Sequence, residues 1–223
     1  MTEFKLNSIK KIFLCIKRVT ALFIFSAAIM GCFYYPVGKI YLTAGVVLYS
    51  IISIRFPLFP LFFIPAFLPL VNLAPWSGVV LFEEFDLFLI ATLGVSVWKG
   101  DYSKNIFKNL NYLSLACIAL FLISITISLL KGLLPFSVLQ PNDLSNYLSP
   151  FNSLRIGRSF LWAILLFPLV MNSFLKNRET AYKSIIAGFM FGVIGVCGIV
   201  FWERGVINDI LHATNRYELL NNL

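Results

Sequence analysis

The chain has 223 residues, of which 59% are hydrophobic and only 13% are charged, and its formal net charge is +8. Soluble globular domains are typically about 45–50% apolar and about 25% charged, and a domain of this size has too small an interior to bury so much apolar surface. The composition therefore argues against a soluble domain and predicts an all-α, polytopic transmembrane helix bundle. Its basic balance suits loops beside anionic lipid headgroups, so membrane lipids are the expected surroundings and no nucleic-acid partner is expected.

Apolar runs divide the chain into candidate membrane spans. The seven runs are residues 19–35, 40–54, 56–71, 85–98, 110–130, 159–175 and 184–202. A straight membrane span needs roughly 20 apolar residues, a length that the first, fifth, sixth and seventh runs approach and the other three do not. We expect about seven spans, with a basic cytoplasmic segment at 1–18, a transmembrane bundle at 19–202 and an outer tail at 203–223.

The third run, 56–71, is unusual because it contains four prolines, Pro57, Pro60, Pro65 and Pro69. A proline inside a helix removes a backbone hydrogen bond and crowds the preceding turn. In lipid the freed carbonyl groups need protein or water partners. We therefore expect a kinked or partly unwound helix packed inside the bundle, with a re-entrant segment as the alternative.

The distribution of Lys and Arg predicts the orientation of the bundle. Cytoplasmic loops of membrane proteins are enriched in these residues. With seven spans and a cytoplasmic N-terminus, two thirds of the 18 Lys and Arg residues fall in cytoplasmic segments. We therefore expect the N-terminus inside and the C-terminus outside, with outer loops at 72–84 and 131–158.

Three acidic residues, Glu83, Glu84 and Asp86, lie where the fourth run enters the membrane. Glu83 and Asp86 are three residues apart, so a helix places them on one face. Carboxylates at membrane depth usually face a cavity or a cationic partner, which suggests a polar wall of a substrate cavity. The alternative is an ordinary helix start, where acidic side chains favour the positive end of the helix dipole.

Arg155 and Arg158 are also three residues apart, just before the sixth run. The planar guanidinium group suits phosphate because it can donate two parallel hydrogen bonds. The alternative is a pair of interfacial anchors whose charged ends reach the lipid phosphates.

The end of the seventh run carries Trp202, Glu203 and Arg204. A tryptophan with a local ion pair is common at a membrane interface, so these residues alone do not indicate a site. His212 is the only histidine and is expected to be solvated. No metal-binding, nucleotide-binding or nucleophile motif is present, so no catalytic residue is assigned.

Three segments together resemble the N-terminal half of O-antigen ligase-like and polysaccharide polymerase-like membrane proteins. They are Asn72-Leu-Ala-Pro-Trp-Ser-Gly78 with Phe82-Glu-Glu-Phe-Asp86, Ser149-Pro-Phe-Asn-Ser-Leu-Arg155 leading into Ser159-Phe-Leu-Trp162, and Trp202-Glu-Arg204. The resemblance covers most of the chain from the third run onward. Members of that family work at the outer face of the bacterial inner membrane in surface polysaccharide assembly. They are glycosyltransferases that move a glycan from a polyprenyl diphosphate carrier to an acceptor.

The resemblance implies roles for particular residues. Arginines in the outer loops of that family bind the diphosphate, and no metal or cofactor is required. Carried over by position, the diphosphate-binding candidates are Arg155 and Arg204, with Arg158 and Arg216 as neighbours. The acids expected to line the same cavity are Glu83, Glu84, Asp86 and Glu203.

Length is the main departure from the family, whose members are longer and carry essential Arg and His residues in a large outer loop. We therefore expect this chain to lack the catalytic half, with 203–223 as the start of a truncated periplasmic loop. It would then be a truncated frame, one part of a split enzyme that needs a partner, or a non-catalytic relative. Two alternatives stay open: a transporter or flippase-like protein, for which the proline-rich run 56–71 is the only indication, and a non-enzymatic membrane subunit.

Overall fold

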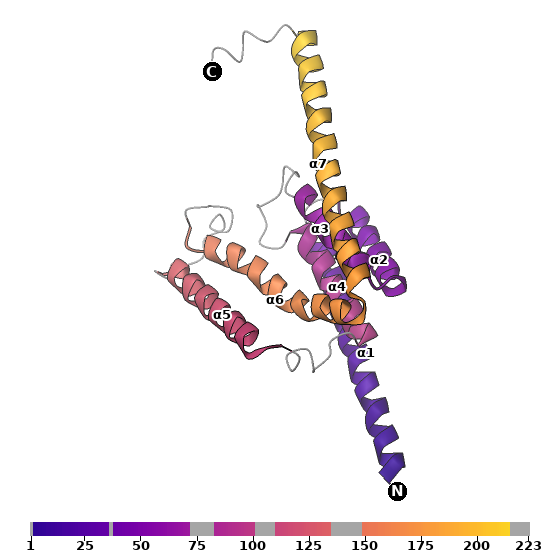
Figure 1. The fold of residues 1–223 in the computed structure, drawn as a ribbon. Coiled ribbons are helices and arrows are strands. Elements are labelled where there is room, and N and C mark those ends of the chain that lie inside the picture. Colours follow the sequence, from indigo (N-terminus) through magenta and orange to yellow (C-terminus); the bar gives the residue numbers. More distant parts are fainter. Residues whose placement is uncertain (1, 36–37, 72–82, 101–109, 135–148, 215–223) are drawn as a thin grey trace.

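The computed structural model describes residues 2–35, 38–71, 83–100, 110–134 and 149–214, and all regular structure in these ranges is α-helical. The helices are α1 (Thr2–Tyr34), α2 (Lys39–Arg55), α3 (Phe59–Val71), α4 (Glu84–Lys99), α5 (Tyr112–Leu133), α6 (Asn152–Lys176) and α7 (Arg178–Thr214). The expected all-α class is thus confirmed for the described residues. The long helices α1 and α7 extend beyond the others at opposite ends of the molecule (Figure 1).

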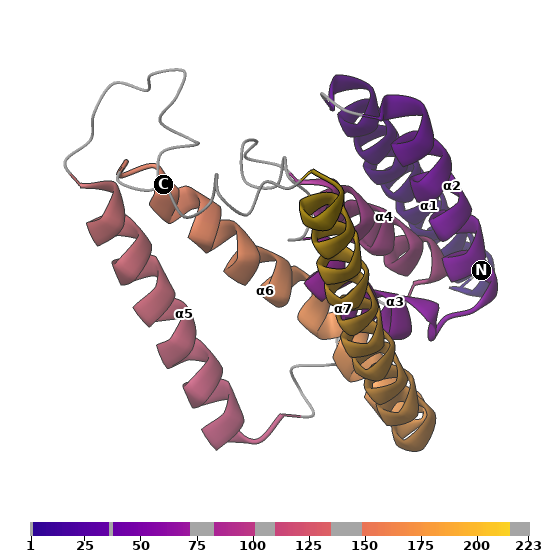
Figure 2. The same cartoon turned by 90° about the horizontal axis from the view of Figure 1, so that it is seen from above.

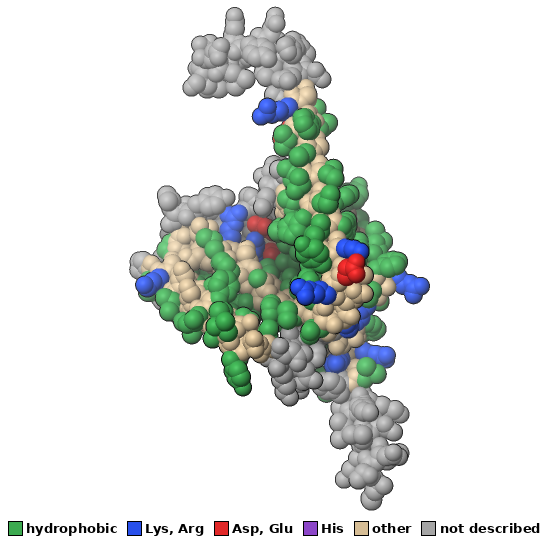
Figure 3. All heavy atoms as spheres, viewed as in Figure 1, with side chains coloured by type: hydrophobic (Ala, Val, Ile, Leu, Met, Phe, Trp, Pro, Cys, Tyr) green, Lys and Arg blue, Asp and Glu red, His purple; other side chains and the backbone are tan. Residues whose placement is uncertain are grey.

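Within the described residues, four helices are long and apolar enough to cross a membrane. These stretches are Leu14–Tyr34 of α1, Tyr112–Leu133, Asn152–Lys176 and Arg178–Val206 of α7. Hydrophobic side chains cover much of the visible surface of α7, and charged side chains lie near its start (Figure 3). Helices α2, α3 and α4 are shorter, and the 13 residues of α3 extend about 20 Å, whereas the hydrocarbon core of a bilayer is about 30 Å thick.

Helices α1, α2 and α4 pack together with α3 around an aromatic core. Tyr49 of α2 lies against Phe63 and Phe88, with ring centroids 4.6 and 5.4 Å away, and its hydroxyl is 2.6 Å from the hydroxyl of Thr92 on α4. Small residues such as Ala28 of α1 are fully buried in this core. The high phenylalanine content of the chain is therefore partly used in packing between helices.

The proline-rich helix α3 packs closely against α7. A Cβ atom added at Gly192 of α7 would lie 2.9 Å from Cγ of Pro69 and 3.0 Å from the carbonyl oxygen of Ala66. Only glycine allows the two backbones to approach so closely, as at many helix contacts in membranes. On its other side α3 contacts α4 and α2, so it is packed inside the bundle as the prolines suggest.

Helix α5 lies to one side and packs chiefly along α6 (Figure 2). The rings of Phe121 and Phe160 meet edge to face at 6.0 Å. None of the residues of α5 is buried. In the isolated chain, α5 therefore presents most of its apolar surface outward.

Three helices extend well beyond the apolar runs from which we inferred them. Helix α6 begins at Asn152 instead of in the run 159–175, so Arg155 and Arg158 lie within a helix and not in the expected loop 131–158. Helix α7 continues past Trp202 to Thr214, and α1 includes nearly all of the basic segment 1–18. Hydropathy locates only the apolar part of a helix and does not detect the amphipathic turns at the ends of that helix.

Candidate functional site

The site begins at the N-terminus of α4. Glu83 precedes the helix in an extended conformation (φ −91°, ψ 167°), and its backbone N–H donates a 2.6 Å hydrogen bond to Oδ2 of Asp86. A carboxylate in the first turn satisfies a backbone donor that has no helical partner and favours the positive end of the helix dipole. The acidic residues therefore do mark a helix start, which was one of their two interpretations.

Asp86 also contacts two side chains of α6. Nη1 of Arg158 lies 2.9 Å from Oδ2 of Asp86, and the indole Nε1–H of Trp162 donates a 2.6 Å hydrogen bond to Oδ1. Asp86 is only 2% exposed. Arg158 and Trp162 are four residues apart and so share one face of α6, which is the face packed on α4.

Glu83 adds two further ion pairs to this arrangement. Its Oε1 atom lies 3.2 Å from Nη2 of Arg158 and 3.8 Å from Nη2 of Arg155. All three side chains are at most 19% exposed. We call Glu83, Asp86, Arg155 and Arg158 the carboxylate–arginine cluster. Its two negative and two positive charges balance, which offsets the high free-energy cost of burying each charge alone.

Glu84, the third acid, faces a different neighbour. It is hydrogen-bonded to the side chain of Tyr35, which follows α1 and is 5% exposed. The N-terminus of α4 thus carries polar contacts toward both α6 and the end of α1.

An apolar groove of about 420 Å³ between α5 and α6 adjoins the cluster. Its apolar lining includes Ile125, Leu129, Leu154, Phe160, Leu161 and Ile164. Arg158 and Trp162 complete the wall of this groove. Arg158 therefore contacts the buried carboxylates and also borders an open apolar surface.

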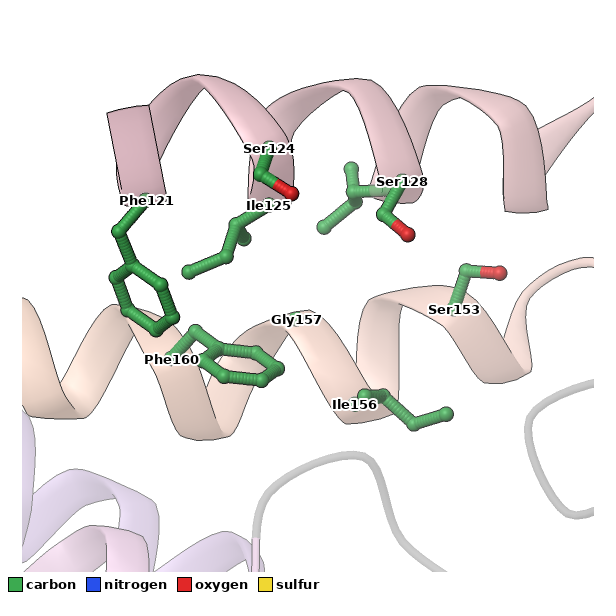
Figure 4. Close-up of a pocket in the computed structure, with 9 residues that line it drawn as sticks. Phe121, Ser124, Ile125, Ser128, Ser153, Ile156, Gly157 and Phe160 are labelled. Carbon is green, nitrogen blue, oxygen red and sulfur yellow. The ribbon is translucent and has the colours of Figure 1, made fainter. Parts of the chain in front are cut away.

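A neighbouring cleft of about 410 Å³ lies on the same pair of helices. Figure 4 shows Phe121 and Phe160 at one end and the hydroxyl groups of Ser128 and Ser153 at the other. No charged side chain lines this cleft. Of the two, only the groove beside Arg158 reaches the cluster.

The structure brings together only part of the predicted site. Arg155 and Arg158 meet Glu83 and Asp86, whereas Glu203 and Arg204 are exposed on α7. The prediction for Arg216 falls outside the described residues. Sequence reasoning missed the role of Trp162, although its spacing of four and seven residues from the two arginines places it on their helix face.

Among the residues that the structure describes, no group of three His, Cys, Asp or Glu side chains is placed to hold a metal ion. The cluster offers fixed guanidinium groups beside an apolar groove, which suits an anion that carries a hydrocarbon chain.

Comparison with known proteins finds no matching family model, curated protein or solved structure.

Proposed function

We propose that this chain is a multi-pass protein of the bacterial inner membrane, with about seven spans and its N-terminus in the cytoplasm. We further propose that it binds a polyprenyl diphosphate-linked glycan at the outer face, as its resemblance to O-antigen ligase-like proteins implies. One observation carries the proposal: Arg158 belongs both to the carboxylate–arginine cluster and to the wall of the apolar groove. A lipid-linked donor has the same two parts, an anionic diphosphate and a long hydrocarbon chain.

The carboxylates give the arginines a defined geometry. A guanidinium group has five N–H donors, and the two carboxylates contact Nη1 and Nη2 of Arg158. An arginine near membrane depth is costly unless it is paired, so Asp86 and Glu83 stabilise Arg158 in a fixed orientation. A diphosphate in the groove would add a third anion to this arrangement, with Arg155 as the adjacent cation.

The arginines would act on the charge of the leaving group. When an acceptor hydroxyl attacks the sugar carbon, a new carbon–oxygen bond forms and the bond from that carbon to the diphosphate oxygen breaks. The diphosphate departs with the bonding electrons, and the hydroxyl proton is released to the solution. Fixed positive groups beside that oxygen stabilise the transition state. We assign no catalytic base to this chain, and glycosyltransferase activity would require the outer-loop residues that members of the resembled family carry.

A second candidate function is a membrane subunit that needs a partner. Helix α5 has no buried residue, so its surface is open to lipid or to another protein. If a partner covers α5, the chain purified in mild detergent should carry that partner, and Leu120→Glu, at a residue of α5 that is 67% exposed, should release it. A chain that purifies alone from its native membrane would contradict this candidate.

The main proposal is tested by the affinity of the purified protein, in lipid nanodiscs, for polyprenyl diphosphate and polyprenyl monophosphate. The wild-type protein should prefer the diphosphate. Arg155→Gln and Arg158→Gln should each weaken diphosphate binding by about tenfold or more, because each removes a charge-assisted hydrogen bond. Arg178→Gln, an exposed arginine at the start of α7, is the matched control and should bind normally.

Two outcomes of this experiment would contradict the proposal. One is equal affinity for the two lipids in the wild-type protein. The other is a lower Tm without a change of affinity in Arg158→Gln, because the cluster would then serve only to hold α4 against α6.

A further inference from the structure

A second groove lies between α1 and α2, about 320 Å³ in volume and apolar over its exposed lining. Its apolar lining includes Leu22, Phe25 and Ile29 of α1 and Val47, Ile51 and Ile54 of α2. Trp98, near the C-terminus of α4, is also part of the lining. The groove is therefore separate from the carboxylate–arginine cluster, which lies at the N-terminus of α4.

Two arginines continue the apolar stripes of this groove. On α1, Leu22, Phe25 and Ile29 share one helix face, and Arg18 is the next position along it, four residues before Leu22. On α2, Arg55 follows Ile51 by four residues in the same way. Both arginines are exposed. Helices α1 and α2 run antiparallel, because they pack together and only a short connection joins them. Arg18 and Arg55 therefore mark the same end of the groove, and Trp98 lies beside Arg18 at that end.

Packing contacts hold the basic side chains at this end. The Arg18 guanidinium carbon lies 5.8 Å from the centre of the Trp98 ring, a distance at which the ring face attracts a cation. Lys99 donates a 2.8 Å hydrogen bond to the carbonyl oxygen of Ser53 on α2. Lys17 reaches the turn after α4, where its Nζ would be 3.3 Å from a Cβ atom added at Gly100.

Three acidic side chains lie at the end of α4 opposite to Trp98. Asp86 precedes Lys99 by 13 residues of α4, which corresponds to about 20 Å along the helix, and Glu83 and Glu84 lie beside Asp86. Glu179 is paired with Lys183 at 2.6 Å. The described basic side chains at this end of the groove, Lys17, Arg18, Arg55 and Lys99, therefore adjoin an apolar lining.

We propose that the groove between α1 and α2 binds an anionic glycerophospholipid, with one acyl chain along the groove and the phosphate at Arg18 and Arg55. Charge complementarity selects this occupant, because the exposed guanidinium groups of Arg18 and Arg55 continue the two apolar stripes at this end of the groove. Trp98 has the amphipathic ring typical of a membrane interface. The inference rests on the membrane setting of the proposed function and is independent of the glycan site.

Native mass spectrometry of the full chain in detergent tests the proposal with phosphatidylglycerol and phosphatidylcholine of identical acyl chains. The wild-type protein should retain phosphatidylglycerol preferentially. Replacing both arginines, Arg18→Gln with Arg55→Gln, should weaken phosphatidylglycerol binding roughly 30-fold and remove the preference. Lys39→Gln, an exposed change at the other end of α2, should bind as the wild type does.

A groove-filling variant separates this site from the diphosphate site. Ile51→Trp should weaken phosphatidylglycerol binding and leave the affinity for polyprenyl diphosphate unchanged. The proposal is overturned if the wild type binds the two phospholipids equally, or if the double arginine variant keeps its preference. The proposal is also overturned if Ile51→Trp weakens the binding of phosphatidylglycerol and of polyprenyl diphosphate equally, because the groove would then not be a separate site.

Discussion

The indole Nε1–H of Trp162 donates a 2.6 Å hydrogen bond to Oδ1 of Asp86, which lies 76 residues earlier in the chain. Oδ2 of the same carboxylate accepts the backbone N–H of Glu83 and contacts Arg158. The two oxygens of Asp86 thus tie the start of α4 to α6 in one defined orientation. Trp162 follows Arg158 by four residues on α6. Trp162 positions the carboxylate of Asp86, which in turn positions Arg158.

Removing the indole donor should destabilise the protein. Trp162→Phe keeps an aromatic ring but leaves Oδ1 of a buried carboxylate without this hydrogen bond, so we expect a loss of about 1.5–3 kcal/mol. Thermal denaturation in detergent measures the change. Trp202→Phe is the matched control, because Trp202 is 68% exposed. Equal effects of the two substitutions would show that the hydrogen bond contributes little.

The pair formed by Asp86 and Arg158 should behave as a coupled unit. Breaking a buried pair by changing one partner strands the other charge and costs about 3–5 kcal/mol. Asp86→Asn and Arg158→Gln should therefore each be strongly destabilising, while the double variant should lose less than the sum of the two. A double-mutant cycle on unfolding free energies gives the coupling, expected at about 1–3 kcal/mol. Strict additivity would contradict the ion pair.

The glycines of α7 provide a test of its packing on α3. Gly192→Leu would force side-chain atoms against Pro69 and the carbonyl oxygens of α3, and overpacking of this kind costs about 1–3 kcal/mol. Gly198, on the same helix, has no atom within 4 Å of an added Cβ. Gly198→Leu should therefore leave the Tm nearly unchanged. If both variants melt alike, α3 and α7 do not meet as described.

The groove between α5 and α6 should bind the hydrocarbon part of a lipid-linked donor. Leu161, which is 53% exposed, lines this groove beside Arg158. Leu161→Trp should weaken the binding of a long polyprenyl diphosphate more than that of a short-chain analogue. Ile194→Trp on α7, at a residue that is 66% exposed, is the control and should affect neither ligand. An equal effect on long and short chains would place the hydrocarbon elsewhere.

Hydropathy was sufficient to locate the helices but insufficient to predict their first and last residues. The run 40–54 differs from α2 by one residue at each end, because both of its ends are marked by basic residues. The start of α6 was missed because its first two turns carry Arg155 and Arg158 on one face, which lowers their mean hydropathy. The continuation of α7 through Glu203 and Arg204 was missed for the same reason, because charged residues lower the mean hydropathy.

The sequence indicated which charged residues of the candidate site share a helix face, but it did not indicate that the acids and the arginines contact each other. The spacing of three residues indicated that Glu83 and Asp86 share a face, and likewise Arg155 and Arg158. No local pattern indicates that the two pairs meet, because that contact depends on how α6 crosses α4. The capping hydrogen bond from Glu83 to Asp86 also shows that a helix start and a charged site are compatible uses of the same acids.

The central claim is that the carboxylate–arginine cluster opens on the outer side of a membrane, and labelling from outside the cell tests it most directly. In a variant whose native cysteines are replaced, a single cysteine is introduced as Asn152→Cys at the start of α6 or as Arg178→Cys just after its end. A membrane-impermeant maleimide should label position 152 in intact spheroplasts and position 178 only after the membrane is opened. Labelling of position 178 but not of position 152 in sealed spheroplasts would contradict the account.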